Sequence, residues 1–280
     1  MARLFVEQLT VIDCAYLDAA RGLVGESWIV DLELEGELDA QSMVLDFGEV
    51  KKRLKRALDR SADHTLLVPL RDPGLSLHRS DGRVSLQFSG PAAGPIEHHS
   101  PPQALTLLDA HRVDAASLAV HLQPILAAEV PANVAQVRLS LRNEDIRGSY
   151  YHYTHGLKKH QGQCQRIAHG HRSRLEIRAG GVRDAALENT WAAHWKDIYL
   201  GSREDLAERG DGRLRFAYTS AEGDFELALP EGRCDLLEGD STVECIAGHL
   251  AARSGALRPG QPIEVRAYEG VMKGAVASVL

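Results

Sequence analysis

Hydrophobic and polar residues alternate in several stretches of the chain, which is the pattern of half-buried β-strands. Residues 3–17 alternate loosely, and a turn-rich segment follows at residues 20–25. Residues 27–35 alternate more strictly and place four apolar side chains on one face: Trp28, Val30, Leu32 and Leu34. We therefore expect the chain to begin with two strands, the second of which buries one face.

Two later segments have helical spacing. The first has apolar residues at every third or fourth position: Phe47, Val50, Leu54 and Leu58. Asp46 fits as the cap of this helix, and its basic face is interpreted as solvated rather than as a nucleic-acid surface. A proline-containing link is expected at residues 90–102, a second helix at 114–126 and a strand at 137–142.

The order of elements then restarts. Residues 174–177 correspond to residues 29–32, and Ser241 to Glu244 fits a capping box at the start of a helix that matches the one near residue 114. The chain is therefore interpreted as a tandem duplication. The expected units are residues 1–146 and residues 147–280.

Composition and charge narrow the class of protein. A length of 280 residues suits one large or two ordinary domains, and the net charge of −7 argues against general binding to nucleic acid or to anionic membranes. The cysteines are scattered and form no paired motif, which is typical of reduced thiols: Cys14, Cys164, Cys234 and Cys245. The N-terminus has no apolar signal core, and no segment is long enough to span a bilayer. A cytoplasmic location is expected.

Five of the chain's 13 histidines lie between residues 151 and 171. His169 and His171 are two residues apart in a strand-like segment, so both project from the same face. An antiparallel return would bring His155 over that face. Three imidazoles leave a fourth tetrahedral position open, as in catalytic zinc sites, whereas the alternative is a run of solvated histidines on a polar loop.

This region has a histidine, a glycine-rich turn, a cysteine and then His169-Gly170-His171. That order resembles the sequence pattern of the 6-pyruvoyltetrahydropterin synthase and 6-carboxytetrahydropterin synthase family. The resemblance implies that His155, His169 and His171 bind Zn²⁺ and that Cys164 is the catalytic base. The family spacing has three residues between the cysteine and His-Gly-His, but this chain has four. Strict alignment puts Gln165 in the cysteine's place, and a one-residue bulge would restore Cys164.

The two halves differ in a complementary way. Where the second half has His169-Gly170-His171, the first has Val24-Gly25-Glu26, and near the position of His155 the first half has Ala15-Tyr16. Conversely, Asp63-His64 resembles the family's proton-transfer pair, and the second half has no Asp-His pair in the corresponding region. We expect a composite site in which the second half binds the metal and the first half supplies Asp63 and His64.

The resemblance also implies a substrate, 7,8-dihydroneopterin triphosphate, held at its pterin ring by a carboxylate. Glu269, at the end of an expected strand at residues 263–267, matches the family's pterin-anchoring glutamate, and Glu144 is taken as its first-half counterpart. Basic residues around Cys164 are expected to attract the triphosphate.

The family fold implied is α+β, with two tandem T-fold units whose antiparallel sheets carry helices on one face and join into a β-barrel on oligomerisation. A homotrimer would supply the usual six units. The implied activity is that of a 6-carboxytetrahydropterin synthase, which releases acetaldehyde and triphosphate in queuosine biosynthesis. Formation of the 6-pyruvoyl product, a folate-route side-chain cleavage and a non-catalytic pterin- or metal-binding assembly protein remain alternatives.

Overall fold

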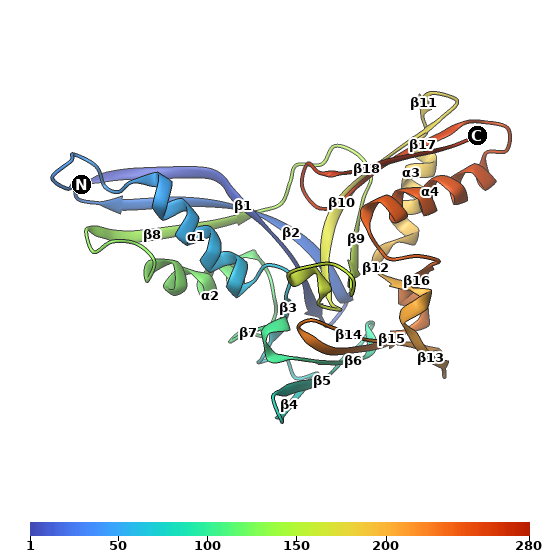
Figure 1. Cartoon of the computed structure of the whole chain (residues 1–280), viewed down its shortest axis with the longest axis horizontal. Helices are drawn as coiled ribbons and strands as arrows, with labels where there is room; N and C mark the ends of the chain where they lie inside the picture. The colour runs from blue at the N-terminus through green and yellow to red at the C-terminus, as the bar shows by residue number, and fades with distance from the viewer.

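A computed structural model describes residues 1–280 as an α+β protein built on three sheets (Figure 1). The first sheet has the strand order β7-β3-β1-β2-β8. Its strands are β1 (Ala2–Asp18), β2 (Gly22–Gly36), β3 (Leu66–Pro69), β7 (Leu105–Leu108) and β8 (Val134–Arg142). The long β1–β2 hairpin confirms the two strands expected at the start of the chain, although β2 begins at Gly22, inside the segment expected as a turn.

The second sheet has the order β16-β12-β9-β10-β17-β18, and β11 pairs with β10 beside this path. Its strands are β9 (Tyr150–His155), β10 (His169–Ala179), β11 (Val182–Arg183), β12 (Lys196–Ser202), β16 (Cys234–Leu237), β17 (Ile263–Tyr268) and β18 (Gly274–Val279). Strand β18 covers the outer edge of β17, whereas β8 has no such neighbour in the first sheet.

The third sheet joins the two halves of the chain. Its order is β13-β14-β15-β6-β5-β4, so β15 from the second half pairs directly with β6 from the first. Its strands are β4 (Leu75–Ser80), β5 (Arg83–Gly90), β6 (Gly94–Ser100), β13 (Leu206–Gly210), β14 (Arg213–Ser220) and β15 (Gly223–Pro230). The expectation of a simple link at residues 90–102 was wrong, because most of this segment is β6.

Each of the first two sheets carries a helix pair on one face. Helices α1 (Phe47–Ser61) and α2 (Ala115–Ala127) cover the first sheet, and α3 (Ala185–His194) and α4 (Val243–Leu257) cover the second. The face predicted for β2 packs under α1 and α2. Asp46 caps α1 as expected, but α4 is capped by Thr242 rather than Ser241. No helix is both long and apolar enough to cross a lipid bilayer.

Four one-turn 3-10 helices complete the chain: η1 (Pro102–Ala104), η2 (Gln163–Gln165), η3 (Arg203–Asp205) and η4 (Glu231–Arg233). From β9 onward the elements repeat the earlier order of a hairpin, a helix, a strand, a three-stranded meander, a strand, a helix and a strand. This repetition supports the duplication. We propose the connection between β8 and β9 as the boundary between the two units.

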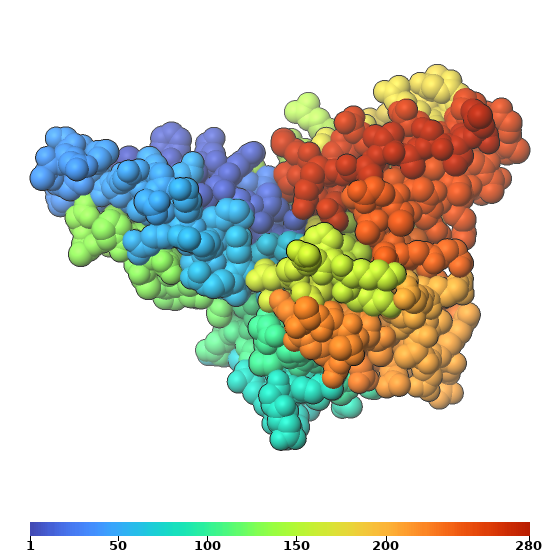
Figure 2. Space-filling model, in the orientation of Figure 1, coloured from blue at the N-terminus to red at the C-terminus, as the bar shows by residue number.

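The molecule has three lobes, one for each sheet (Figure 2). The first unit's sheet and helices form the lobe at the left, the second unit's form the lobe at the right, and the shared sheet lies below. The yellow-green segment that follows β9 lies at their junction. A core cluster packed from strands of both units fills the space above the shared sheet.

Candidate functional site

The three histidines singled out in the sequence meet at the end of the β9–β10 hairpin. His155 pairs directly with His169 in the antiparallel ladder, and His171 lies two residues further along β10 on the same face. Their ligand nitrogens lie within 4.8 Å of one another. The side chains are buried, with relative exposures of 0% for His155 and 1% each for His169 and His171.

Each imidazole has its Nδ1 atom turned outward to an acceptor. Nδ1 of His155 donates to the Ser241 carbonyl at 2.9 Å, Nδ1 of His169 donates to the Arg166 carbonyl at 3.0 Å, and Nδ1 of His171 lies 3.1 Å from Oδ1 of Asp13. A carbonyl oxygen only accepts, so the Nε2 atoms of His155 and His169 are left unprotonated. This is the usual arrangement around metal-binding histidines.

Three buried atoms in this cluster have no hydrogen-bond partner from the protein: Nε2 of His155 and both Nδ1 and Nε2 of His171. Buried polar atoms are normally satisfied, so the two Nε2 atoms are best explained by a group that the protein binds. Nδ1 of His171 has the Asp13 carboxylate 3.1 Å away. Burial also lowers the pKa of His155 and that of His169 well below the usual range, and the neighbouring histidines lower both further. His155 and His169 therefore stay neutral, as metal ligands must. The donor set fits Zn²⁺.

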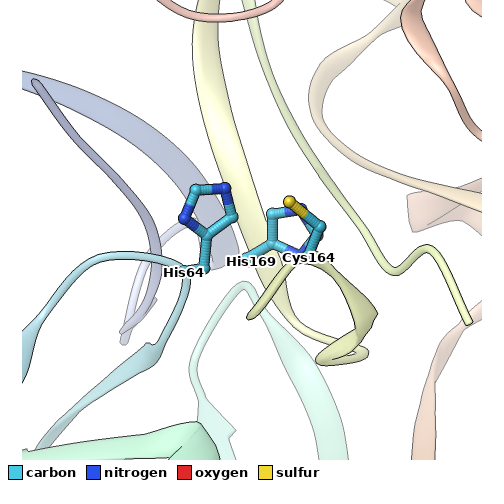
Figure 3. Close-up of side chains that lie close together, drawn as sticks. All are labelled: His64, Cys164 and His169. Carbon is cyan, nitrogen blue, oxygen red and sulfur yellow. The ribbon is translucent and has the colours of Figure 1, made fainter. Parts of the chain in front are cut away.

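His64 from the first unit reaches this cluster (Figure 3). Its ring centroid is 4.9 Å from that of His169, and His64, Cys164 and His169 form a second group of ligand atoms within 4.8 Å of one another. Nδ1 of His64 is 2.8 Å from Oδ2 of Asp63. Histidines of the second unit and the Asp63-His64 pair of the first thus meet within one chain.

The pKa of His64 is raised to about 10. Burial opposes this shift, but hydrogen bonds to Asp63 and Cys164 outweigh it. In the metal-free protein the His64 imidazole is therefore a cation at neutral pH. A protonated imidazole stabilises a neighbouring thiolate and can deliver a proton to a reacting group.

The turn that carries Cys164 explains the one-residue difference in spacing. Cys164 lies in η2, and its neighbour Gln165 is buried and bonded within the turn, where Nε2 donates to the Gly162 carbonyl and Oε1 accepts from the Glu222 amide. Gln165 is thus used to hold the turn together. Cys164, and not Gln165, lies beside His64 and His169.

Glu269 lies near the same site through Lys273. Nζ of Lys273 is 3.7 Å from Oε2 of Glu269 and 3.6 Å from Oδ2 of Asp13. Glu144 is placed differently, 3.5 Å from Nε of Arg174.

The strand register shows which residue of the first unit is equivalent to Glu269, and it is not the one expected from the sequence. Leu32 pairs with Leu139, and Ile177 pairs with Val265 in the same way. Counting on from these pairs places Asn143 at the position of Glu269, with Glu144 one residue further. Glu144 is therefore not the counterpart that the sequence comparison proposed.

The first unit contains an altered copy of the histidine site. Tyr16 pairs with Val24 as His155 pairs with His169, and Glu26 occupies the place of His171. Arg21 lies among these residues: its guanidinium donates to the Tyr16 hydroxyl at 2.9 Å and to both oxygens of Asp197, at 2.5 and 3.1 Å. The Arg21 guanidinium thus lies in the first unit where the second unit has its histidine cluster.

Three of the basic residues around Cys164 are already paired with carboxylates. Lys158 and Lys159 form ion pairs with acidic side chains of the second unit, and Arg166 is bonded to Glu222 at 2.8 Å. The expectation that these cations attract a triphosphate is therefore not supported by their contacts.

Sequence reasoning missed four contacts of the site: those of Asp13, Ser241, Lys273 and Arg21. Each is distant in sequence from the group that it touches, and three of them cross between the units. For example, Asp13 lies opposite Ser27 in the β1–β2 hairpin, and this pair forms no recognisable sequence motif. No local pattern could have identified these residues.

Comparison with known proteins gives a family model that matches part of the chain. The family model described as 6-pyruvoyl tetrahydropterin synthase matches residues 15–147, which end before the three histidines. A search of curated proteins gave no match.

Two solved structures align with about half of the chain. The 6-pyruvoyltetrahydropterin synthase of Plasmodium vivax is 18% identical, covers 51% of this chain and 98% of its own, and has a TM-score of 0.40. The Plasmodium falciparum enzyme is 18% identical, covers 50% and 90%, and has a TM-score of 0.41.

Proposed function

Because residues 15–147 match the 6-pyruvoyl tetrahydropterin synthase family model, we propose that this chain belongs to that family and is a zinc-dependent lyase that acts on the side chain of a pterin. The α+β tandem T-fold expected from the sequence agrees with this family. The specific reaction proposed is that of 6-carboxytetrahydropterin synthase. In it, 7,8-dihydroneopterin triphosphate and water give 6-carboxytetrahydropterin, acetaldehyde and triphosphate.

The observation that carries the proposal is that His64 and Cys164 lie beside His169 (Figure 3), which also belongs to the cluster of three histidines. His155, His169 and His171 would hold the metal. When bound, Zn²⁺ supplies a Lewis acid that stabilises negative charge on the oxygens of the pterin side chain.

The protein's own groups would move the protons. The Sγ atom of Cys164 would take a proton from the side-chain carbon next to the pterin ring. Nε2 of His64 would return a proton to the other end of the side chain, because its Nδ1 is held by Asp63. Burial of the cluster keeps bulk water from competing for these protons.

Glu269 would accept hydrogen bonds from the amino-pyrimidine edge of the pterin. Its nearness to Lys273 and Asp13 supports this role, since the substrate must span from Glu269 to the metal ligands. A carboxylate is suited to this edge because it accepts two parallel hydrogen bonds.

We further propose that the chain forms a homo-oligomer, with a homotrimer favoured. The outer strands β8 and β18 leave backbone donors and acceptors unpaired at the ends of the first two sheets, which supports edge-to-edge joining. Light scattering at several protein concentrations tests this assembly independently of activity.

Incubation with 7,8-dihydroneopterin triphosphate, followed by identification of the product, tests the proposed reaction. The expected products are 6-carboxytetrahydropterin and acetaldehyde, and His169→Ala should give neither. A 6-pyruvoyl product or a shortened side chain would assign a related reaction. Pterin binding without turnover by the zinc-loaded protein would favour the non-catalytic alternative.

A further inference from the structure

Asp13 on β1 lies where the two units meet, with a relative exposure of 4%. Its carboxylate contacts groups of both units. Oδ1 is 3.1 Å from Nδ1 of His171 and accepts a hydrogen bond of 2.5 Å from the Ser27 hydroxyl, while Nζ of Lys273 is 3.6 Å from Oδ2. A carboxylate of the first unit is thus placed against a metal-site histidine of the second.

The backbone of Asp13 holds the other half of the candidate site. Its carbonyl accepts from the His64 amide at 2.7 Å, and its amide donates to Oδ1 of Asp63 at 2.8 Å. The first contact also fixes His64 in its left-handed conformation, with φ of 51°. A single residue therefore contacts both the metal-site histidines and the Asp63-His64 pair.

The turn after Glu269 packs on the same carboxylate. Gly270 has φ of 66°, and a β-carbon added there would lie 2.5 Å from Oδ1 of Asp13. Only glycine fits this approach. The position of Glu269 is thus linked to Asp13 by direct packing as well as through Lys273.

This set of contacts is not a general property of the repeated fold. In the second unit the counterpart of Asp13 is His152, because His152 pairs with Arg172 as Asp13 pairs with Ser27. His152 is bonded through Nδ1 to the Gly25 carbonyl at 2.7 Å. The carboxylate is present only on the side that faces the three histidines.

We propose that Asp13 is the positioning residue that organises the composite site. Its carboxylate accepts the Nδ1–H of His171, so that Nε2 is presented without a proton, and its backbone holds Asp63 and His64 beside the same histidines. This inference rests on the proposed metal site. Carboxylates behind metal-binding histidines fix the tautomer in this way, and their loss typically weakens metal binding about 10- to 100-fold.

The first experiment needs no metal and no substrate. The ¹⁵N NMR spectrum of histidine-labelled, metal-free protein reports the tautomer of His171, whose signals are assigned by comparison with His171→Gln. The wild type should carry the proton on Nδ1, and Asp13→Ala should shift His171 toward the Nε2–H form. A wild-type His171 protonated on Nε2 overturns the inference.

The second experiment measures zinc affinity by competition with a chromogenic chelator. Asp13→Ala should weaken binding about 10- to 100-fold. Asp13→Asn should bind better than Asp13→Ala, because the amide oxygen still accepts from Nδ1. Asp31→Asn, on the exposed face of β2, is the matched control and should match the wild type.

The outcomes separate the two proposals. If the wild type shows the Nδ1–H tautomer but binds no zinc, the proposed metal function fails and the positioning role of Asp13 stands. If Asp13→Ala does not fold, Asp13→Leu replaces it, because leucine has a similar volume and accepts no hydrogen bond. A zinc affinity of that variant equal to the wild type overturns the inference. Folding is checked by circular dichroism.

Discussion

His64 and Asp197 occupy equivalent positions in the two units, and both have left-handed backbones, with φ of 51° and 56°. Each lies two residues before a strand residue that pairs in parallel with the first strand of its unit, Leu66 in one and Tyr199 in the other. His64 reaches the histidines of the second unit, whereas Asp197 binds Arg21 of the first. The fold thus brings together two related sites per chain, and only one has a cluster of three histidines.

This asymmetry predicts about one zinc ion per chain. His169→Ala should remove the metal, because it takes away one of three ligands. Glu26→Gln should retain it, since Glu26 occupies the position of His171 in the altered copy. Elemental analysis of purified protein measures both, and equal zinc contents in the two variants would reject the ligand assignment.

Cys164→Ala should lower turnover about 100-fold or more while leaving zinc bound, because a positioned acid–base group contributes at least that much. The exposed Cys245 offers a control, and Cys245→Ala should turn over substrate like the wild type. Steady-state rates with the pterin triphosphate give the comparison. Normal turnover by Cys164→Ala would transfer the role of base to another group.

His64→Ala should also lower turnover about 100-fold or more at unchanged zinc content. Because His64 and His169 meet within one chain, mixing inactive His64→Ala with inactive His169→Ala should restore no activity. Subunit exchange is first demonstrated with differently tagged chains. Recovered activity in such mixtures would show that the working site forms between chains.

Glu26 gives a prediction for stability against pH. Burial raises its pKa to about 7, although Arg172 and Arg21 oppose the shift. Between the unfolded value of 4.5 and about 7, the folded state binds more protons than the unfolded state, so the free energy of unfolding falls as pH rises through this window. Glu26→Gln cannot ionise, so its free energy of unfolding should not fall for this reason.

The variant should therefore be more stable than the wild type by about 1–3 kcal/mol at pH 8, with the difference shrinking toward pH 4.5. Urea unfolding with a chelator present, at one protein concentration, measures it. Glu33→Gln on the exposed face should show no such trend. A Glu26→Gln difference that is constant with pH would contradict the assignment.

Sequence patterns correctly predicted the features that depend on residues close together in the chain. The buried face of β2 follows from alternation, and α1 follows from its spacing and from Asp46, whose side chain accepts from the Gly48 amide. The histidine site was also predictable, because His169 and His171 share a strand face and His155 needs only one hairpin to join them.

Contacts between distant segments were not predictable. Strand β6 contains Gly94 and Pro95 and resembles a loop, but its pairing with β5 and β15 makes it a strand. Ser241 was expected to cap α4, yet its carbonyl accepts from His155 and Thr242 takes the cap. Neither result depends on neighbours in sequence.

The carboxylate of Asp13 illustrates the same limit at the site. In the sequence it is one acidic residue in a β-strand, and only the docking of one unit on the other sets it against His171. Arg21 and Asp197 are separated in the same way. Such pairs depend on the geometry between units, which no periodicity encodes.

The pairing of β6 with β15 has a consequence for the history of the chain. If the two units were separate chains, each would pair with a copy of itself as often as with the other unit. Many such pairs would lack either the three histidines or His64. A covalent tether keeps the complement at a high local concentration. In a fused chain, one unit could lose the histidines and the other the Asp-His pair. Every molecule would still contain both.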